Sequence, residues 1–179
     1  MPSLGGAIAC MDDASPRLEK LEIYGSMANL GAGIAISDSD PTISEVLISG
    51  TEARNRGAGI YMSNSNSTII ASTISGNIAF EFGGGIYMTN SNPEISYLEI
   101  SGNSANRGGG VYVDFSTPIF KFNTIHSNTA ENRGGGVIKG GTSGDKEVGG
   151  LNNDSEHEER WRDAFFREKG RSGRSMRGS

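Results

Sequence analysis

The sequence is poor in the residues that cross-link small domains or hold metal ions. Cys10 is the only cysteine, so no disulfide can form within the chain. The two histidines, His126 and His157, have no cysteine partners at a zinc-binding spacing. We therefore expect a fold held by packing and backbone hydrogen bonds, with no metal site and no cofactor.

Hydrophobic residues are also scarce, at 35% of the chain. No apolar run approaches the roughly 18 residues that a membrane-spanning helix needs, so we expect no membrane span. The first residues, Met1 to Gly6, lack the charged and apolar regions of a secretory signal. If the protein is exported, this chain does not encode the signal.

Positive charge is not in excess, because the formal net charge is −5. Nucleic acid is therefore not an expected partner, since binding phosphates needs a basic face. Charged residues are sparse up to residue 140 and dense after it, with 8 Lys/Arg and 8 Asp/Glu between residues 141 and 179. This shift predicts a repeat domain over 1–140 and a separate linker and charged tail over 141–179.

Glycine, in contrast, is abundant, with 27 residues, and much of it is periodic. A triplet of small residues begins at Gly31, Gly57, Gly83, Gly108 and Gly134, in steps of 26, 26, 25 and 26, with a weaker copy at Gly5. A fixed period in this range is typical of solenoid proteins. The sequence therefore contains a repeat of about 26 residues.

Each triplet leads into a short segment of alternating side chains such as Ile86-Tyr87-Met88, which predicts a strand with tyrosine on the outer face. Two further apolar positions follow in each repeat, so we predict three strands per repeat and a triangular coil. Stacking such coils about 4.8 Å apart buries a shared core. The predicted fold is an all-β, right-handed parallel β-helix of about five coils; a β-sandwich is the alternative, but it would not require such regular spacing.

Two smaller patterns recur with the same period. Asn77, Asn103 and Asn128 follow the third predicted strand in consecutive repeats, where stacked amides can form a hydrogen-bonded ladder. Alanine stands two residues later and is expected to fill a tight corner, at Ala28, Ala53, Ala79, Ala105 and Ala130.

The repeats, with Gly-Gly-Gly-Ile-Tyr at Gly83 to Tyr87 and Ile-Ser-Gly-Asn at Ile100 to Asn103, resemble those of right-handed β-helix proteins of the pectate-lyase-like superfamily. They are also similar to the repeats of chlamydial-type polymorphic outer membrane proteins. The resemblance covers residues 5–138. It implies an extracellular or cell-surface setting, in adhesins, autotransported passengers or enzymes that act on polysaccharides.

The candidate binding residues are Tyr61, Tyr87 and Tyr112, which we expect to form an outward strip of rings one coil apart. Such a strip suits stacking on sugar rings. The competing interpretation is a surface column that only stabilises its sheet through contacts between neighbouring strands.

No residue set predicts catalysis. A polysaccharide lyase needs clustered acidic calcium ligands and a base, and a glycoside hydrolase needs two carboxylates at a catalytic separation. Asp38 and Asp40 are replaced by Asn64 and Asn66 in the next repeat, and Asp114 is isolated, so these acids are interpreted as turn residues. No catalytic residue is predicted.

The tail offers one structural hypothesis. Ser155 and Glu158 form a capping-box pattern ahead of a helix over residues 156–169, in which Trp161 and Phe165 share a side that could cover the end of the stack. A disordered tail is the alternative.

Taken as a whole, the sequence favours a non-catalytic surface or extracellular module for adhesion or glycan contact, with a polysaccharide or a host or cell surface as partner. A polysaccharide lyase or glycoside hydrolase, or its inactive remnant, is the first alternative, and a structural spacer is the second. The repeat that begins at Gly5 predicts an open coil end, suited to end-to-end self-association, in a piece of a larger protein.

Overall fold

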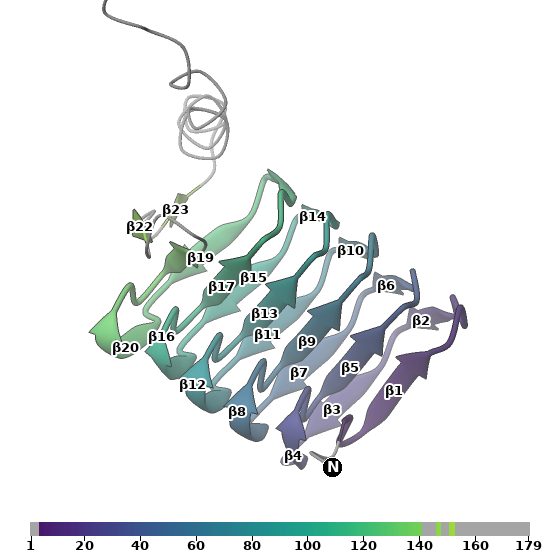
Figure 1. The fold of residues 1–179 in the computed structure, drawn as a ribbon, viewed down its shortest axis with the longest axis horizontal. Coiled ribbons are helices and arrows are strands. Elements are labelled where there is room, and N and C mark those ends of the chain that lie inside the picture. Colours follow the sequence, from purple (N-terminus) through teal and green to yellow (C-terminus); the bar gives the residue numbers. More distant parts are fainter. Residues whose placement is uncertain (1–3, 141–145, 148–150, 153–179) are drawn as a thin grey trace, which may run out of the picture.

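The computed structural model describes residues 4–140, 146–147 and 151–152. The chain winds into a stack of coils, and each full coil adds one strand to each of four sheets (Figure 1). Within the stack every strand pairs in parallel with its equivalents in the neighbouring coils. The predicted parallel β-helix is therefore confirmed.

The first two sheets hold the strands that follow each glycine triplet. The first contains β1 (Ile8–Met11), β5 (Ile34–Ser37), β9 (Ile60–Ser63), β13 (Ile86–Thr89), β17 (Val111–Asp114), β21 (Val137–Lys139) and the antiparallel β22 (Lys146–Glu147). The second contains β2 (Arg17–Glu19), β6 (Thr42–Ser44), β10 (Thr68–Ile70), β14 (Glu94–Ser96) and β18 (Ile119–Lys121).

The other two sheets complete the coil. The third contains β3 (Glu22–Tyr24), β7 (Leu47–Ser49), β11 (Thr73–Ser75), β15 (Glu99–Ser101), β19 (Thr124–His126) and the antiparallel β23 (Leu151–Asn152). The fourth contains β4 (Met27–Leu30), β8 (Glu52–Arg56), β12 (Ile78–Phe82), β16 (Ser104–Arg107) and β20 (Thr129–Arg133).

The core is made of columns of like side chains. In the first sheet Ile34, Ile60, Ile86 and Val111 are in register and almost fully buried. β-branched residues suit these strands because they pack well on a pleated surface. Each fully buried aliphatic side chain stabilises the fold by about 1.5–3 kcal/mol, so the repeated isoleucines are the main cohesive element of the stack.

The predicted coil of three strands is wrong, because the coil has four. The missed strand carries the alanine column, which lies inside β4, β8, β12, β16 and β20 and not at a corner. Ala53, Ala79 and Ala105 are buried and pack with Ala32 and Ala58 of the triplets. The coil interior is narrow here, so only small side chains fit, and the segment lacks the bulky alternation that predicts a strand.

The fourth sheet contains strands of two lengths. β8, β12 and β20 have five residues, whereas β4 and β16 have four. The register shifts accordingly, because Ala79 pairs with Ala105 but Phe82 pairs with Arg107. The repeat of 25 residues thus arises from one residue missing in β16.

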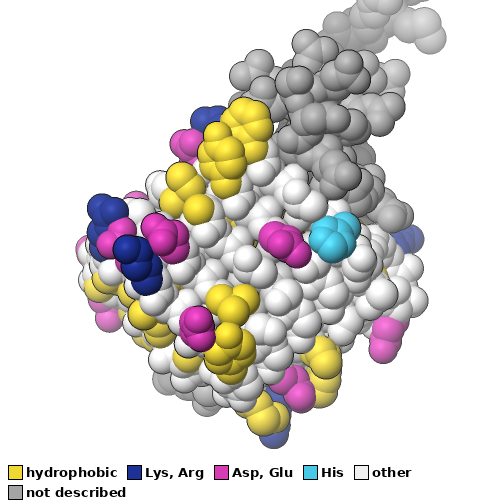
Figure 2. Space-filling view, turned by 180° about the vertical axis from the view of Figure 1, so that it is seen from behind, with side chains coloured by type: hydrophobic (Ala, Val, Ile, Leu, Met, Phe, Trp, Pro, Cys, Tyr) yellow, Lys and Arg dark blue, Asp and Glu magenta, His cyan; other side chains and the backbone are white. Residues whose placement is uncertain are grey.

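The outer surface is not uniformly polar. Seen from behind, hydrophobic side chains form small separate patches, several with charged side chains beside them (Figure 2). In the part of the chain that the structure describes, the large exposed hydrophobic side chains are Met11, Tyr24, Met27, Ile78, Phe80, Tyr97, Phe115, Ile119 and Phe122. No helix among the described residues is long and apolar enough to span a membrane. The predicted helix over residues 156–169 lies outside the described residues.

Candidate functional site

The three tyrosines selected from the sequence lie side by side on the first sheet. Tyr61, Tyr87 and Tyr112 come from β9, β13 and β17 and are paired in register. The rings of Tyr61 and Tyr87 stack with centroids 5.6 Å apart, and those of Tyr87 and Tyr112 with centroids 5.7 Å apart. The column therefore exists as a continuous stack outside the isoleucine core.

The expectation that this stack faces solvent is wrong for two of its rings. Tyr87 is 2% and Tyr112 is 7% exposed, while Tyr61 is half-buried. Phe82 is the last residue of β12, and the centroid of its ring lies 4.8 Å from the centroid of the Tyr112 ring. The guanidinium carbon of Arg56 lies 5.2 Å from the centroid of the Tyr87 ring. The fourth sheet thus covers the stack, and carbohydrate binding by these tyrosines stays a prediction.

Tyr87 joins two charged groups from different coils. Its hydroxyl accepts a hydrogen bond from Nη1 of Arg56 (3.3 Å) and donates one to Oδ2 of Asp114 (3.2 Å). Burial is the main cause that raises the pKa of Tyr87 to about 12; Asp114 adds to the rise and Arg56 opposes it. The neutral phenol is therefore the form that the fold stabilises.

This shift predicts how stability depends on alkaline pH. Because the pKa of Tyr87 is higher in the folded protein than its ordinary value of 10.0, its contribution is complete below pH 10 and is lost as the pH rises toward about 12. We expect Tyr87 to ionise late, near pH 12, in a near-ultraviolet titration of the folded protein. The Tyr87→Phe variant should lose that late step, and an unchanged titration curve would contradict the assignment.

The asparagines form a hydrogen-bonded ladder along the stack. Nδ2 of Asn77 donates to Oδ1 of Asn103, and Nδ2 of Asn103 donates to Oδ1 of Asn128, both at 2.9 Å. Asn77 and Asn103 are fully buried. The hydroxyl of Thr51 lies 2.8 Å from Oδ1 of Asn77 and extends the ladder by one coil. These contacts give the ladder a structural role.

Asp38, Asp40 and Asp114 bind residues of neighbouring coils and not one another. Asp38 accepts a hydrogen bond from Nδ2 of Asn64 (3.0 Å), and Asp40 accepts one from the backbone of Asn66 (2.6 Å). Asp114 accepts a hydrogen bond from the hydroxyl of Tyr87. Within the described ranges, no group of three or more His, Cys, Asp or Glu side chains could hold a metal ion.

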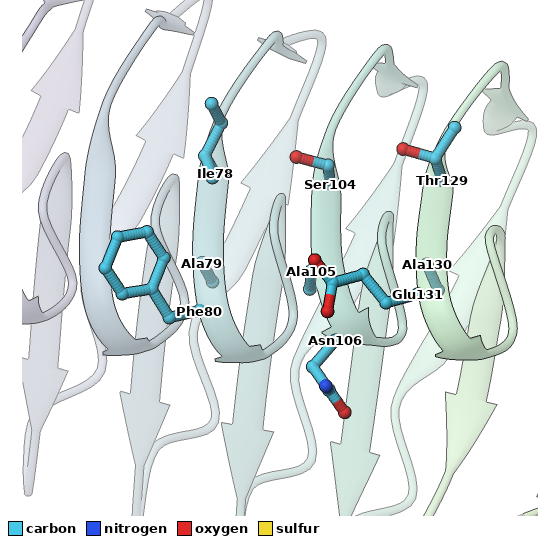
Figure 3. Close-up of a pocket in the computed structure, with 9 residues that line it drawn as sticks. All are labelled: Ile78, Ala79, Phe80, Ser104, Ala105, Asn106, Thr129, Ala130 and Glu131. Atoms are coloured by element: carbon cyan, nitrogen blue, oxygen red, sulfur yellow. The ribbon is translucent and has the colours of Figure 1, made fainter.

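A hollow with a volume of about 540 Å³ lies over the fourth sheet. It spans β12, β16 and β20, and Figure 3 shows three side chains from each strand around it. These are Ile78, Ala79, Phe80, Ser104, Ala105, Asn106, Thr129, Ala130 and Glu131. A smaller hollow lies over the other four-residue strand, β4.

The cause of the hollow is the residue missing from β16. The five-residue strands on both sides have one residue more than β16, so the surface is lower over the shorter strand than over its neighbours. The Phe80 ring projects from β12 on the side away from β16, and the Glu131 side chain reaches from β20 toward Ala105 (Figure 3). The buried Ala79 and Ala105 form the floor.

The hollow combines an apolar wall with polar groups. Ile78 and Phe80 are 46% and 57% exposed. The carboxylate of Glu131 and the hydroxyl of Ser104 line the same space, as does Asn106, whose Oδ1 accepts a hydrogen bond from Nδ2 of Asn132 (3.0 Å). An aromatic face beside hydroxyl, amide and carboxylate groups can bind a ring that has one apolar face and a polar edge.

Sequence reasoning missed this site, although one signal was visible. The single 25-residue step among 26-residue steps marks the coil that contains β16. Locating the missing residue requires the register of a strand that the pattern did not predict. The residue equivalent to Phe80 in the preceding coil is Arg54, and the register shift leaves Phe80 without a paired residue in β16, so no aromatic column was visible in the sequence.

Comparison with known proteins supports the fold and leaves the ligand open. The family model described as a right-handed β-helix region matches residues 5–152. Neither the curated proteins nor the solved structures give a significant match. The narrower resemblances, to pectate-lyase-like and polymorphic outer membrane proteins, stay predictions. The matched region covers most of the 179 residues, and the chain therefore belongs to the right-handed β-helix family.

Proposed function

We propose that this chain is a non-catalytic β-helix module that contacts polysaccharide through the hollow over β16. The observation that supports this proposal is the exposed Phe80 ring beside Asn106, Ser104 and Glu131 in one concavity. The extracellular or cell-surface setting and the role in adhesion are part of the same proposal. They follow from the resemblance of the repeats.

The chemistry of the hollow favours a sugar over a wholly apolar ligand. Stacking on Phe80 would cover the C–H face of a pyranose ring, and such aromatic contacts stabilise by about 0.5–1.5 kcal/mol beyond burial of area. The hydroxyl groups at the ring edge can donate to Glu131 and exchange hydrogen bonds with Asn106 and Ser104. A purely apolar ligand would remove these polar groups from water without offering them new hydrogen bonds, which costs free energy.

Removing the aromatic wall should weaken binding. Affinity gel electrophoresis in soluble neutral polysaccharides (β-glucan, xylan and mannan) measures retardation of the folded protein. We expect Phe80→Ala to weaken retardation by about tenfold for the polysaccharide that binds. Ser104→Trp should weaken it similarly, because an indole on β16 would fill the hollow while Phe80 stays in place.

A matched control is Phe115→Ala, which removes an equally exposed phenylalanine (60%) that does not line the hollow. Its retardation should equal that of the wild type. Retardation equal to that of the wild type in both Phe80→Ala and Ser104→Trp would overturn the proposed site. Release of reducing ends or of unsaturated products from the polysaccharide would overturn the non-catalytic role.

A further inference from the structure

The corner between the second and third sheets repeats one unusual backbone conformation. Each coil turns this corner through a single non-glycine residue with positive φ, at Lys20 (53°), Glu45 (53°), Ala71 (49°), Tyr97 (55°) and Phe122 (54°). Equal conformations in register project the side chains in similar directions, one coil apart. The five residues therefore form a surface column, which we call the corner column.

Two members of the corner column are exposed aromatic rings in contact. The rings of Tyr97 and Phe122 stack with centroids 5.1 Å apart and an interplanar angle of 18°. Their side chains are nevertheless 58% and 53% exposed. The tyrosine stack on the first sheet is covered by Phe82 and Arg56, whereas this pair remains open to solvent.

The corner column leaves one ring face uncovered. Phe122 covers one side of Tyr97, and in the coil on the other side the equivalent residue is Ala71, whose side chain ends at a methyl group. Beyond Ala71 comes Glu45, which is exposed. The surface thus forms a step with the Tyr97 ring as wall, Ala71 as floor and a carboxylate on the far side.

Charged groups flank the aromatic pair. Nζ of Lys121 lies 2.8 Å from Oε1 of Glu94, and Nε2 of His126 lies 3.6 Å from Oε1 of Glu99. Lys121 immediately precedes Phe122, and Glu99 follows Tyr97 by two residues. The rings therefore stand among hydrogen-bonding groups, as a ligand with a polar edge requires.

We propose that this step is a second sugar-stacking site, in which a pyranose ring extends the Tyr97–Phe122 stack over Ala71. The apolar face of the sugar lies on Tyr97, and its hydroxyl groups donate to the Glu45 carboxylate. A hydrophobic protein segment would gain nothing from Glu45, which favours the sugar. This inference rests on the proposed function for its ligand class and assigns a separate site, since β16 belongs to the fourth sheet.

Two opposite substitutions test the step in the same gels of β-glucan, xylan and mannan. Tyr97→Ala removes the wall. Ala71→Phe fills the step with a third ring, which the backbone tolerates because Tyr97 and Phe122 already adopt the same φ. Both variants should weaken retardation severalfold, and Ala71→Phe should do so without lowering the midpoint of urea unfolding.

The matched control is Tyr24→Ala, which removes a tyrosine of equal exposure (58%) whose ring stacks on no other ring among the described residues. It should bind like the wild type; weakening equal to that of Tyr97→Ala would overturn the inference. Wild-type binding by Ala71→Phe would also overturn it, because the ligand would then not occupy the step.

Parallel gels with Phe80→Ala separate this inference from the proposed function. If Phe80→Ala weakens binding and the two step variants do not, the inference about the step is overturned and the proposed function stands. If Ala71→Phe and Tyr97→Ala weaken binding and Phe80→Ala does not, the step is supported and the hollow is overturned as a binding site. Additive losses in the Ala71→Phe/Phe80→Ala double variant would support both sites. A wild-type protein that no polysaccharide retards would overturn both.

Discussion

Replacing Asn103 with alanine is expected to lower the free energy of unfolding by about 3–4 kcal/mol. Oδ1 of Asn103 accepts from the backbone N–H (3.0 Å) and from Nδ2 (2.9 Å) of Asn77. Its own Nδ2 donates to the carbonyl oxygen of Ile74 and to Oδ1 of Asn128, both at 2.9 Å. An alanine would remove all four of these hydrogen bonds and would leave the buried backbone N–H of Asn77 without its acceptor. A buried polar group left unpaired costs about 1–3 kcal/mol, and each lost hydrogen bond adds to that cost.

Urea unfolding followed by far-ultraviolet circular dichroism measures this loss. The matched control is Asn132→Ala, because Nδ2 of Asn132 also donates to an asparagine of the neighbouring coil, Asn106, but does so at the surface. The control should change stability by less than about 0.5 kcal/mol. Equal losses in the two variants would mean that the buried ladder contributes no more than a surface hydrogen bond.

The ladder was predictable because its cause is local and periodic. Asparagine recurs at one place in three repeats, and a parallel stack brings equal places into contact. The burial of Tyr87 was not predictable in the same way. It depends on Phe82 and Arg56, which end strands of a sheet that the hydrophobic pattern did not reveal. The alternation of side chains identifies which residues face outward from one sheet. It does not show whether side chains of a neighbouring sheet cover those residues.

The Tyr97–Phe122 pair escaped prediction for a different reason. Both residues stand in turns with positive φ, where large side chains are uncommon, so neither belongs to an alternating strand pattern. The two positions are 25 residues apart, and only the register of the flanking strands aligns them. A column that begins with Lys20, Glu45 and Ala71 gives no compositional sign that its last two members are aromatic.

The third residue is glycine in all the triplets from Gly31 onward, and Gly59→Ala should show why. A Cβ atom at Gly59 would lie 2.5 Å from the carbonyl oxygen of Gly85 and 2.7 Å from Cγ2 of Ile74. It would also meet Nδ2 of Asn77 at 3.3 Å. The methyl group would therefore press on the next coil, the core and the ladder together, and we expect a loss of about 3 kcal/mol or more in unfolding free energy.

Gly50→Ala separates this crowding from the cost of backbone conformation. Gly50 has a φ of +62°, and nothing lies within 4 Å of a Cβ built there. Ser127 occupies the equivalent corner of a later coil with a φ of 54°, so a side chain is tolerated at that corner. We expect Gly50→Ala to cost only about 1 kcal/mol in the same urea titration. If it destabilised the fold as much as Gly59→Ala, backbone strain, and not the close approach of successive coils, would explain the recurring third glycine of the triplet.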